Sequence, residues 1–498
     1  MSQLFPAFPS EAGRSGQVAR SARILIPEWQ ALQMRLSPAD LRRHVLAIGE
    51  TGSGKTESVL KPLINAMLCS TADPAGPPIP SALIIDPKNR ELTEFLLSRI
   101  DEKRLVVIEP NRGNWLIPLF LPDPNGRILG PEEVLDTLVS ANRENVEGNL
   151  RNAGFWIASA RRMVAGFVAG DRWIVKNRNI SSCLDLWQSL LGEGSSGFPS
   201  GSDRNRSGTD HLNVRELWYR GGYLDLLAHA ISRSLANADF LRLWAATHKG
   251  YGTPAPLCEG NLGLIDIAKE TFGGIVLTVQ NLLDPFLLPA TGGHLWTNPF
   301  LPPTQEKVVD PAALMDRGAV VIYCPPDPST RSNVLGRAIK RHFFHSSLQI
   351  RDRSRPFLYI ADEFQRFITA DPHFSEATFF DRCRSYGISC IVATQSESSL
   401  RFAMETGMSP GAGESALQVI LSNLATQFYF RTTDSSTQNR LRSLIPHHPT
   451  DASLPHVVDV RPVTSLAPGE AYWLAASGRW GRGRIQLRPP GAGVGKTP

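Results

Sequence analysis

The sequence lacks long hydrophobic runs. No stretch approaches the roughly 20 consecutive apolar residues that a membrane-spanning helix needs, and the first residues, MSQLFPAFPSEAGRSG, do not have the layout of a signal peptide. These absences argue against an integral membrane segment in the chain as given. We therefore expect a soluble, cytoplasmic protein.

Cysteine is also scarce, with six residues among 498. None belongs to a CxxC pair, and their scattered spacing argues against both a zinc site and a disulfide framework. A reducing compartment such as the cytosol suits such a chain. The six are Cys69, Cys183, Cys258, Cys324, Cys383 and Cys390.

A strong net charge is missing as well. The formal charge is +5 with 42% hydrophobic residues, which excludes a highly charged disordered chain and leaves material for more than one core. The positive charge is concentrated at the ends, because residues 1–44 carry a net +3 and residues 476–498 a net +5. Basic ends fit nucleic acid or an anionic surface, although solvated tails are the more common explanation.

Residues 41–61, LRRHVLAIGETGSGKTESVLK, form the most informative segment. The apolar run 45–48 is typical of a buried parallel strand, and the glycines of GETGSGKT let the backbone N–H groups curl around phosphates. Lys55 is expected to reach the β- and γ-phosphates and Thr56 to bind Mg²⁺. The predicted nucleotide-binding residues are Gly49, Glu50, Thr51, Gly52, Ser53, Gly54, Lys55, Thr56 and Glu57.

Strands and helices alternate after this loop. Residues 82–85 and 105–108 are further apolar runs, each ending in charged or proline residues. This order predicts an α/β fold with a mainly parallel sheet and a ligand at the carboxyl edge of its strands.

The pattern changes to helical spacing between about 130 and 300, with the clearest periodicity over 155–168 and 224–235. The glycine- and serine-rich segment 192–211 is typical of a mobile loop. We interpret the region as an all-α domain inserted into the α/β core. The predicted organisation is a flexible arm (1–40), the first part of the nucleotide-binding domain (41–129), the inserted all-α domain (130–300), the second part of the nucleotide-binding domain (301–475) and a basic tail (476–498).

Apolar strands return at 319–324 and 357–361, and the second ends in Asp362 and Glu363. A P-loop needs an acid from a neighbouring strand to hold Mg²⁺, and an adjacent carboxylate can polarise the attacking water. We assign Asp362 and Thr56 to the metal and Glu363 to the water. The alternative is an ordinary strand with an acidic edge.

The strand 388–393 is followed by a polar terminus that includes Gln395, which is placed to sense the γ-phosphate or to orient water. A glutamine at a strand end can equally be a hydrogen-bonding edge residue, which would be the preferred interpretation without the Asp-Glu strand. Arg382 and Arg384 precede this strand on a surface segment. Either arginine can complete a neighbouring subunit's site as a finger, but surface arginines are common.

Taken together, GETGSGKT, LIIDPKNREL, FLYIADEFQRF, RSYGISCIVATQS and APGEAYW resemble the ordered motifs of type IV secretion coupling proteins, the TraG/TraD class of conjugative DNA-transfer ATPases. The resemblance spans residues 41–475. It implies a RecA-like P-loop core that assembles into a hexamer and translocates DNA with ATP and Mg²⁺. It also implies that Arg384 is the finger, that Gln395 is the motif glutamine, and that the helical domain meets relaxase or secretion-system proteins.

Two departures from this family's pattern are visible. Its members usually begin with two membrane helices, so either a partner recruits this chain to the inner membrane or it works elsewhere. The family's DPKGE-like segment reads DPKNR here, which leaves the role of Lys88 open.

Two alternative functions therefore remain. One is a soluble HerA- or FtsK-like translocase working with a nuclease, and the other is an ATP-dependent adaptor that recruits protein substrates through residues 130–300.

Overall fold

We analysed a computed structural model of the chain. It describes residues 40–41, 43–69, 79–110, 153–191, 214–220, 222–236, 239–264, 267–287, 309–350, 355–369, 375–408, 411–445 and 461–485, with residue 141 and short strands at 23–24, 34–35, 117–118, 296–297 and 487–488.

The chain divides into two compact units. The first comprises Met1–Ile108, Pro311–Pro328 and Lys340–Pro498, and the second Glu109–Asp310 and Ser329–Ile339. The predicted all-α insertion, 130–300, falls within the second unit, and its boundaries stay a prediction. The predicted mobile loop at 192–211 and most of the predicted arm at 1–40 lie outside the described residues.

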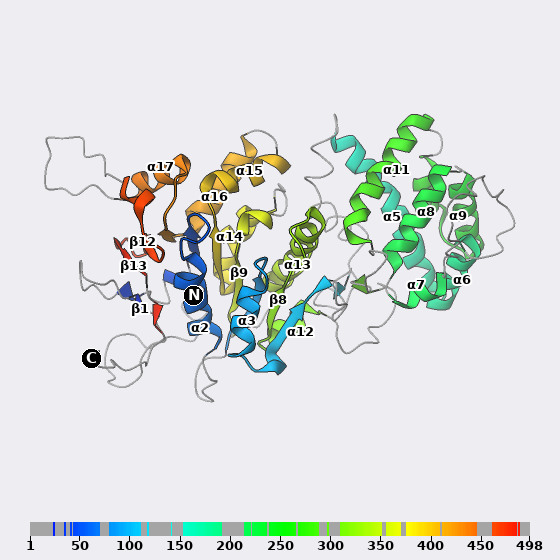
Figure 1. Ribbon diagram of the computed structural model, residues 1–498. Helices are drawn as coiled ribbons and strands as arrows, with labels where there is room; N and C mark the ends of the chain where they lie inside the picture. The colour runs from blue at the N-terminus through cyan, green and yellow to red at the C-terminus, as the bar shows by residue number, and fades with distance from the viewer. Residues whose placement is uncertain are drawn as a thin grey trace, which may run out of the picture. The chain divides into compact units, whose positions relative to one another are not determined.

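The first unit is built on a nine-stranded sheet with the order β13-β12-β11-β3-β10-β9-β4-β8-β5. Figure 1 labels β8, β9, β12 and β13 of this sheet. All strands from β11 to β5 in this order are parallel, and β12 and β13 are antiparallel to their neighbours. The predicted α/β fold with a mainly parallel sheet is confirmed. The strands are β3 (Val45–Ile48), β4 (Ser81–Ile85), β5 (Leu105–Ile108), β8 (Val320–Tyr323), β9 (Phe357–Ala361), β10 (Ile388–Thr394), β11 (Thr426–Tyr429), β12 (Glu470–Leu474) and β13 (Trp480–Arg484).

The central strands form because their residues are apolar on both faces. Strands β3, β9 and β10 are buried along their whole length, as expected for strands covered by helices on two sides. On one face, Leu63 and Leu92 belong to the same hydrophobic core as Ile360. On the other, the ring of Phe344 lies 4.9 Å from that of Tyr359 and stacks on Phe379.

Helices connect these strands as α/β topology requires. The residues of α13 up to Ile339 are grouped with the second unit, and those from Lys340 onward with the first. The helices are α2 (Lys61–Leu68), α3 (Glu91–Leu97), α12 (Pro311–Asp316), α13 (Thr330–Gln349), α14 (Glu376–Cys383), α15 (Glu397–Gly407), α16 (Ala412–Asn423) and α17 (Ser435–Leu444), with single turns η1 (Thr56–Leu60), η2 (Glu102–Arg104), η5 (Phe364–Arg366), η6 (Arg384–Tyr386) and η7 (Arg461–Ser465).

The C-terminal part of the chain differs from the sequence prediction. Residues 480–484, predicted to lie in a basic tail, form the edge strand β13, which pairs along its length with β12. Arginine and glycine alternate in WGRGR, so this strand has no apolar run by which the sequence would reveal it. Short strands β1 (Arg23–Ile24), β2 (Met34–Arg35) and β14 (Leu487–Arg488) form a separate sheet.

The second unit is helical where it is described, apart from the short parallel strands β6 (Ile117–Pro118) and β7 (Trp296–Thr297). Its core includes a buried carboxylate, Asp171, that accepts hydrogen bonds from Trp187 Nε1 (3.1 Å) and the Tyr223 hydroxyl (2.7 Å). The helices are α5 (Ala153–Asn177), α6 (Ile180–Leu191), α7 (Val214–Arg220), α8 (Tyr223–Ala236), α9 (Asp239–Gly250), α10 (Ala255–Leu262) and α11 (Lys269–Leu283), followed by the turn η4 (Asp284–Phe286).

Within the described part of the chain, no helix is both long enough and apolar enough to span a bilayer.

Candidate functional site

The glycine-rich loop joins the end of β3 to a helix that begins as a π-helical turn. In that turn the Lys61 N–H donates to the carbonyl of Thr56, five residues earlier. Pro62 follows and has no N–H to donate, so α-helical bonding cannot be completed at this point. Such wide turns are frequent at functional sites, and this one starts at the residue predicted to bind a metal.

Glycine is needed at positions 52 and 54 of the loop for different structural reasons. Gly52 and Gly54 have φ of 74° and 99°, which side-chain-bearing residues rarely adopt. A Cβ on Gly54 would lie 2.6 Å from the backbone nitrogen of Gly469, whereas one on Gly52 would meet nothing within 4 Å. The loop is therefore packed against residue 469 on one side and open on the other.

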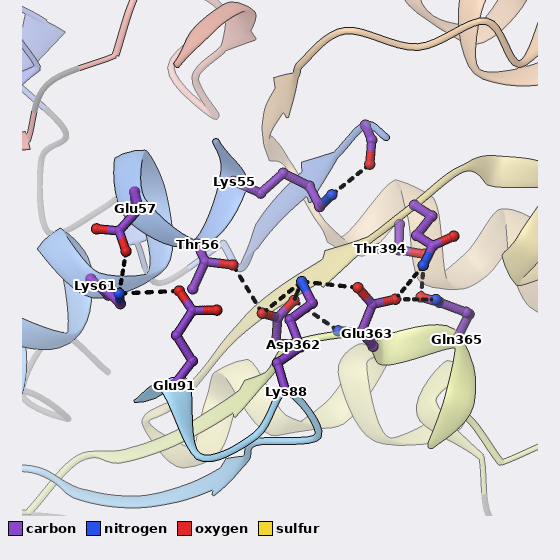
Figure 2. A network of polar contacts seen from close by, with 12 residues as sticks. Lys55, Thr56, Glu57, Lys61, Lys88, Glu91, Asp362, Glu363, Gln365 and Thr394 are labelled. Atoms are coloured by element: carbon purple, nitrogen blue, oxygen red, sulfur yellow. Dashed lines mark hydrogen bonds and ion pairs between the residues drawn. The ribbon is translucent and has the colours of Figure 1, made fainter. Parts of the chain in front are cut away.

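Lys55 is buried and points back into the loop. Its Nζ donates to the carbonyls of Gly49 (2.5 Å) and Glu50 (2.9 Å) (Figure 2). Burial, aided by the nearby Lys88 ammonium, lowers the pKa of Lys55 to about 8, although the surrounding carboxylates oppose the shift. An anion bound in the loop would restore the charged form.

The loop and the acidic pair meet although they are far apart in sequence. Strand β10 lies between β3 and β9, and the hydroxyl of Thr56 donates to Asp362 Oδ2 at 3.0 Å. Neighbouring ligands of an octahedral Mg²⁺ lie about 2.9 Å apart, given Mg–O distances near 2.05 Å. The two oxygens are hard ligands at that spacing, so they fit a magnesium ion.

Glu363 is held by three donors. Its Oε1 faces Lys88 Nζ at 2.9 Å, and its Oε2 accepts from the side-chain amides of Gln365 (2.7 Å) and Gln395 (2.8 Å). Burial alone would raise the pKa of Glu363, but the Lys88 ammonium and these amides lower it below its usual value. Glu363 also has φ of 47°. This is an uncommon conformation for a residue with a side chain, and such outliers cluster at active sites.

The remaining loop residues fix the loop to its neighbours. Glu50 Oε1 accepts from the backbone N–H (2.8 Å) and hydroxyl (2.9 Å) of Thr433, just after β11. The carbonyl of Ser53 accepts from the Gly469 N–H at 2.9 Å. Thr51 is exposed, and Glu57 points outward and pairs with Lys61.

A cavity of about 660 Å³ opens beside the loop, a size typical of small-ligand sites. The predicted residues 51–52 and 54–57 line it. The lining residues that were not predicted include four from the C-terminal part of the chain: Pro468, Gly469, Arg484 and Ile485. The motif APGE was the only sequence signal for Pro468 and Gly469. Arg484 and Ile485 were missed because the strand β13 was not predicted.

Arg384 does not reach this site within one chain. It lies on the exposed turn η6, before β10, whereas Gln395 follows β10. Seven residues of strand span about 23 Å at 3.3 Å each, so Arg384 and the neighbouring Arg382 belong to the opposite edge of the sheet. If either arginine acts on a nucleotide, it does so in another subunit.

A second cluster, which the cysteine spacing did not reveal, brings together buried His44, Cys383 and Cys390. His44 Nδ1 accepts from the Cys390 N–H at 3.0 Å, so the ring proton belongs on Nε2, which lies 3.5 Å from Cys383 Sγ. Burial opposes ionisation, but hydrogen bonds from Cys390 and His44 outweigh it and lower the pKa of Cys383 to about 6. A metal would need Nε2 unprotonated and a fourth ligand. The cluster therefore fits a metal poorly.

A phosphate-binding loop, a threonine hydroxyl on an aspartate from a neighbouring strand, and a cavity at the carboxyl edge of a parallel sheet define the P-loop class of nucleotide-binding folds. A family sequence model described as the TraM recognition site of TraD and TraG matches residues 356–445. This match confirms, for that segment, the resemblance to coupling proteins predicted from the motifs.

Solved structures of the conjugative coupling protein TrwB share the fold. An unbound form is 14% identical with a TM-score of 0.56, covering 96% of both chains. A complex with the ATP analogue ADPNP is also 14% identical, with a TM-score of 0.57, covering 95% of this chain and 96% of the other. At this identity the likeness establishes the fold, a RecA-like P-loop core. No curated protein sequence matches the chain significantly.

Proposed function

We propose that this chain is a P-loop ATPase that drives DNA translocation in conjugation or a related secretion process, as a motor of the coupling-protein class. The observation that carries the proposal is the 3.0 Å contact between Thr56 and Asp362, which brings the acidic pair next to the loop that lines the cavity. The TrwB complexes with ADPNP and with ADP and Mg²⁺ support ATP and Mg²⁺ as ligands of this cavity.

Each residue of the site has a role in this proposal. The loop N–H groups and Lys55 bind the phosphates, while Thr56 and Asp362 would hold Mg²⁺, whose positive charge would offset the negative charge of the phosphates. Glu363 accepts a proton from the attacking water, and Gln395 keeps the Glu363 carboxylate in place. Arg384 is proposed as a finger supplied by a neighbouring subunit.

A hexameric ring is part of the proposal, because a site that takes an arginine from a neighbour is complete only in an assembly. DNA would be gripped by its backbone rather than by sequence, since a motor must hold every step of the strand. Affinity for DNA is then expected to fall as salt rises.

Protein partners are proposed at two places. The helical insert, 130–300, is one candidate surface for relaxase or secretion-system proteins. The family model matched at 356–445 is named for TraM recognition, which favours a partner surface on the first unit as well. The predicted cytoplasmic location stays a prediction.

The competing functions make different predictions. A HerA- or FtsK-like translocase would share the ATPase and its DNA stimulation but would depend on a nuclease partner. An adaptor would bind protein through residues 130–300 without any DNA stimulation.

The deciding experiment measures ATP hydrolysis by the purified chain with and without single- and double-stranded DNA. We expect stimulation by DNA, and a loss of turnover in Glu363→Gln on the order of 100-fold or more with nucleotide binding retained. The matched control is Glu94→Gln, an exposed carboxylate that pairs with Arg90 and does not line the cavity. Hydrolysis unaffected by DNA, or equal losses in the two variants, would contradict the motor.

A further inference from the structure

Lys88 is the cation of the acidic pair. Its Nζ lies 3.1 Å and 3.2 Å from the two carboxylate oxygens of Asp362 and 2.9 Å from Glu363 Oε1. Figure 2 shows Lys88 linked to both acids, whereas Lys55 is linked there to a backbone carbonyl. Lys55 Nζ donates to the loop carbonyls of Gly49 and Glu50. The two lysines of the cavity therefore serve different partners.

The pairing of β4 with β9 determines the position of Lys88 beside the acidic pair. Strand β4 pairs in parallel with β9, Ile85 lies opposite Ala361, and the Asp362 N–H donates to the Ile85 carbonyl at 3.2 Å. The segment after β4 thus leaves the sheet beside the acids, and Lys88 comes three residues after the last strand residue.

A fixed turn presents this side chain. Asp86 Oδ2 accepts from both the backbone N–H (2.8 Å) and the hydroxyl (2.7 Å) of Thr93 and so closes the turn. Within it Asn89 has φ of 44°, a left-handed conformation that asparagine tolerates better than most residues. Asn89 stands where the coupling-protein motif has glycine, so the departure in sequence leaves the conformation available.

Charge explains why the contact matters. Asp362 and Glu363 are adjacent in sequence and are only 1% and 6% exposed. Two buried carboxylates this close repel each other, and a buried charge needs a partner. The other side-chain donors to Glu363, Gln365 and Gln395, are neutral amides. Lys55 and Arg366 also act on Glu363 electrostatically, but Lys88 is in direct contact with both acids.

We propose that Lys88 is a positioning residue that orients the Glu363 carboxylate toward the attacking water and shares Asp362 with the divalent cation. It acts through the acids and need not touch the reacting atoms. The kinetic part of this inference rests on the ATPase function proposed above, whereas its cation-binding part does not.

The kinetic test compares Lys88→Met, Lys88→Arg, Glu363→Gln and the Lys88→Met/Glu363→Gln double variant in the full chain. We expect Lys88→Met to lower kcat on the order of 10- to 100-fold with KM for ATP changed by less than about threefold, because the loss falls on the chemical step. Lys88→Arg should recover much of the rate. In the Glu363→Gln background, Lys88→Met should cost almost nothing further.

Lys61→Met is the matched control, because Lys61 lies near the same cavity but pairs with Glu57 and Glu91. Lys88→Gln replaces Lys88→Met if thermal melting shows that the methionine variant is unstable. A rate loss that adds fully to that of Glu363→Gln, or a rise in KM that accounts for the whole effect, would overturn the positioning role.

The second test needs no turnover. Mn²⁺ titration without nucleotide, followed by electron paramagnetic resonance, should show Lys88→Met binding the ion about three- to tenfold more tightly, since the ammonium no longer competes for Asp362. Unchanged Mn²⁺ affinity would overturn the inference. Tighter Mn²⁺ binding in a chain that hydrolyses no ATP would instead retain the Lys88 contact and reject the proposed function.

Discussion

Lys55 and Lys88, two lysines that line the cavity, differ in the groups that stabilise their positive charge. Lys55 donates to backbone carbonyls, and burial destabilises its ammonium form, so its pKa falls to about 8. Lys88 faces two carboxylates, and although burial opposes protonation, Asp362 and Glu363 raise its pKa above the usual value. Over the ordinary pH range, therefore, Lys55 is the lysine whose charge changes before a ligand binds.

This difference predicts a pH-dependent affinity for nucleotide. Lys55 has a pKa of about 8 in the free chain, so above that pH a phosphate ligand must bind a mostly neutral lysine or drive its protonation. Affinity for a fluorescent ADP analogue should be greatest near pH 7 and weaken by up to about tenfold per pH unit above pH 8. Equilibrium titrations from pH 6 to pH 10 measure it.

Lys55→Arg is the control, since arginine stays charged throughout this range. Its affinity should be flat with pH, whatever its absolute value. The same slope in both proteins would assign the titration to another group.

Among the elements, the β12–β13 hairpin supports the phosphate loop. The Gly469 N–H donates to the Ser53 carbonyl (2.9 Å), the Ile485 N–H donates to the Gly469 carbonyl (2.8 Å), and Gly54 packs against Gly469. Two segments more than 400 residues apart in sequence thereby fix each other.

The packing predicts unequal effects at two glycines of the loop. Gly54→Ala adds both an unfavourable positive φ and a 2.6 Å approach to the Gly469 backbone, whereas Gly52→Ala adds only the positive φ. We expect Gly54→Ala to weaken nucleotide binding by at least tenfold, and Gly52→Ala by distinctly less because its conformational cost is about 1 kcal/mol. Binding titrations and melting temperatures of both variants measure the difference. Equal losses would show that contact with the hairpin is unimportant.

For the whole molecule, the position of Arg384 bears on assembly. Its turn precedes β10 while Glu363 and Gln395 lie at the other end of the sheet. One chain therefore holds the two halves of a proposed shared site at opposite edges, an arrangement that suits head-to-tail contacts in a closed ring.

A subunit-mixing experiment tests this arrangement. Arg384→Ala and Glu363→Gln should each hydrolyse ATP poorly alone. Mixed chains should regain activity, because an Arg384→Ala subunit keeps its own Glu363 and receives an arginine from its Glu363→Gln neighbour. In randomly mixed rings roughly a quarter of the interfaces qualify. ATPase assays of the mixture measure the recovery, and native mass spectrometry checks subunit exchange.

Arg382→Ala mixed with Glu363→Gln identifies which arginine acts. Recovery with the Arg382 variant, and none with the Arg384 variant, would move the role to Arg382. Failure of both mixtures despite confirmed subunit exchange would remove the arginine finger from the proposal.

The sequence by itself predicted the parallel sheet, which the structure confirms, and it singled out the glycine-rich loop and the acidic pair, which the structure brings together. Continuous apolar runs such as 45–48 and 357–361, bounded by turn residues and alternating with helical segments, are typical of buried parallel strands. The motif GETGSGKT predicts a loop conformation from its glycines without reference to distant residues. The strand β13 was not predicted, because its alternating arginines and glycines do not form an apolar pattern.

Only the tertiary structure decided which side chains act together. Lys88 meets Glu363, Gly469 meets Gly54, and His44 meets two cysteines because the strand order places distant segments side by side. Hydrophobic patterning specifies that a strand is buried and says little about its neighbours. The partners of a charged or nucleophilic group are therefore fixed by strand order and turn geometry, which no local pattern contains.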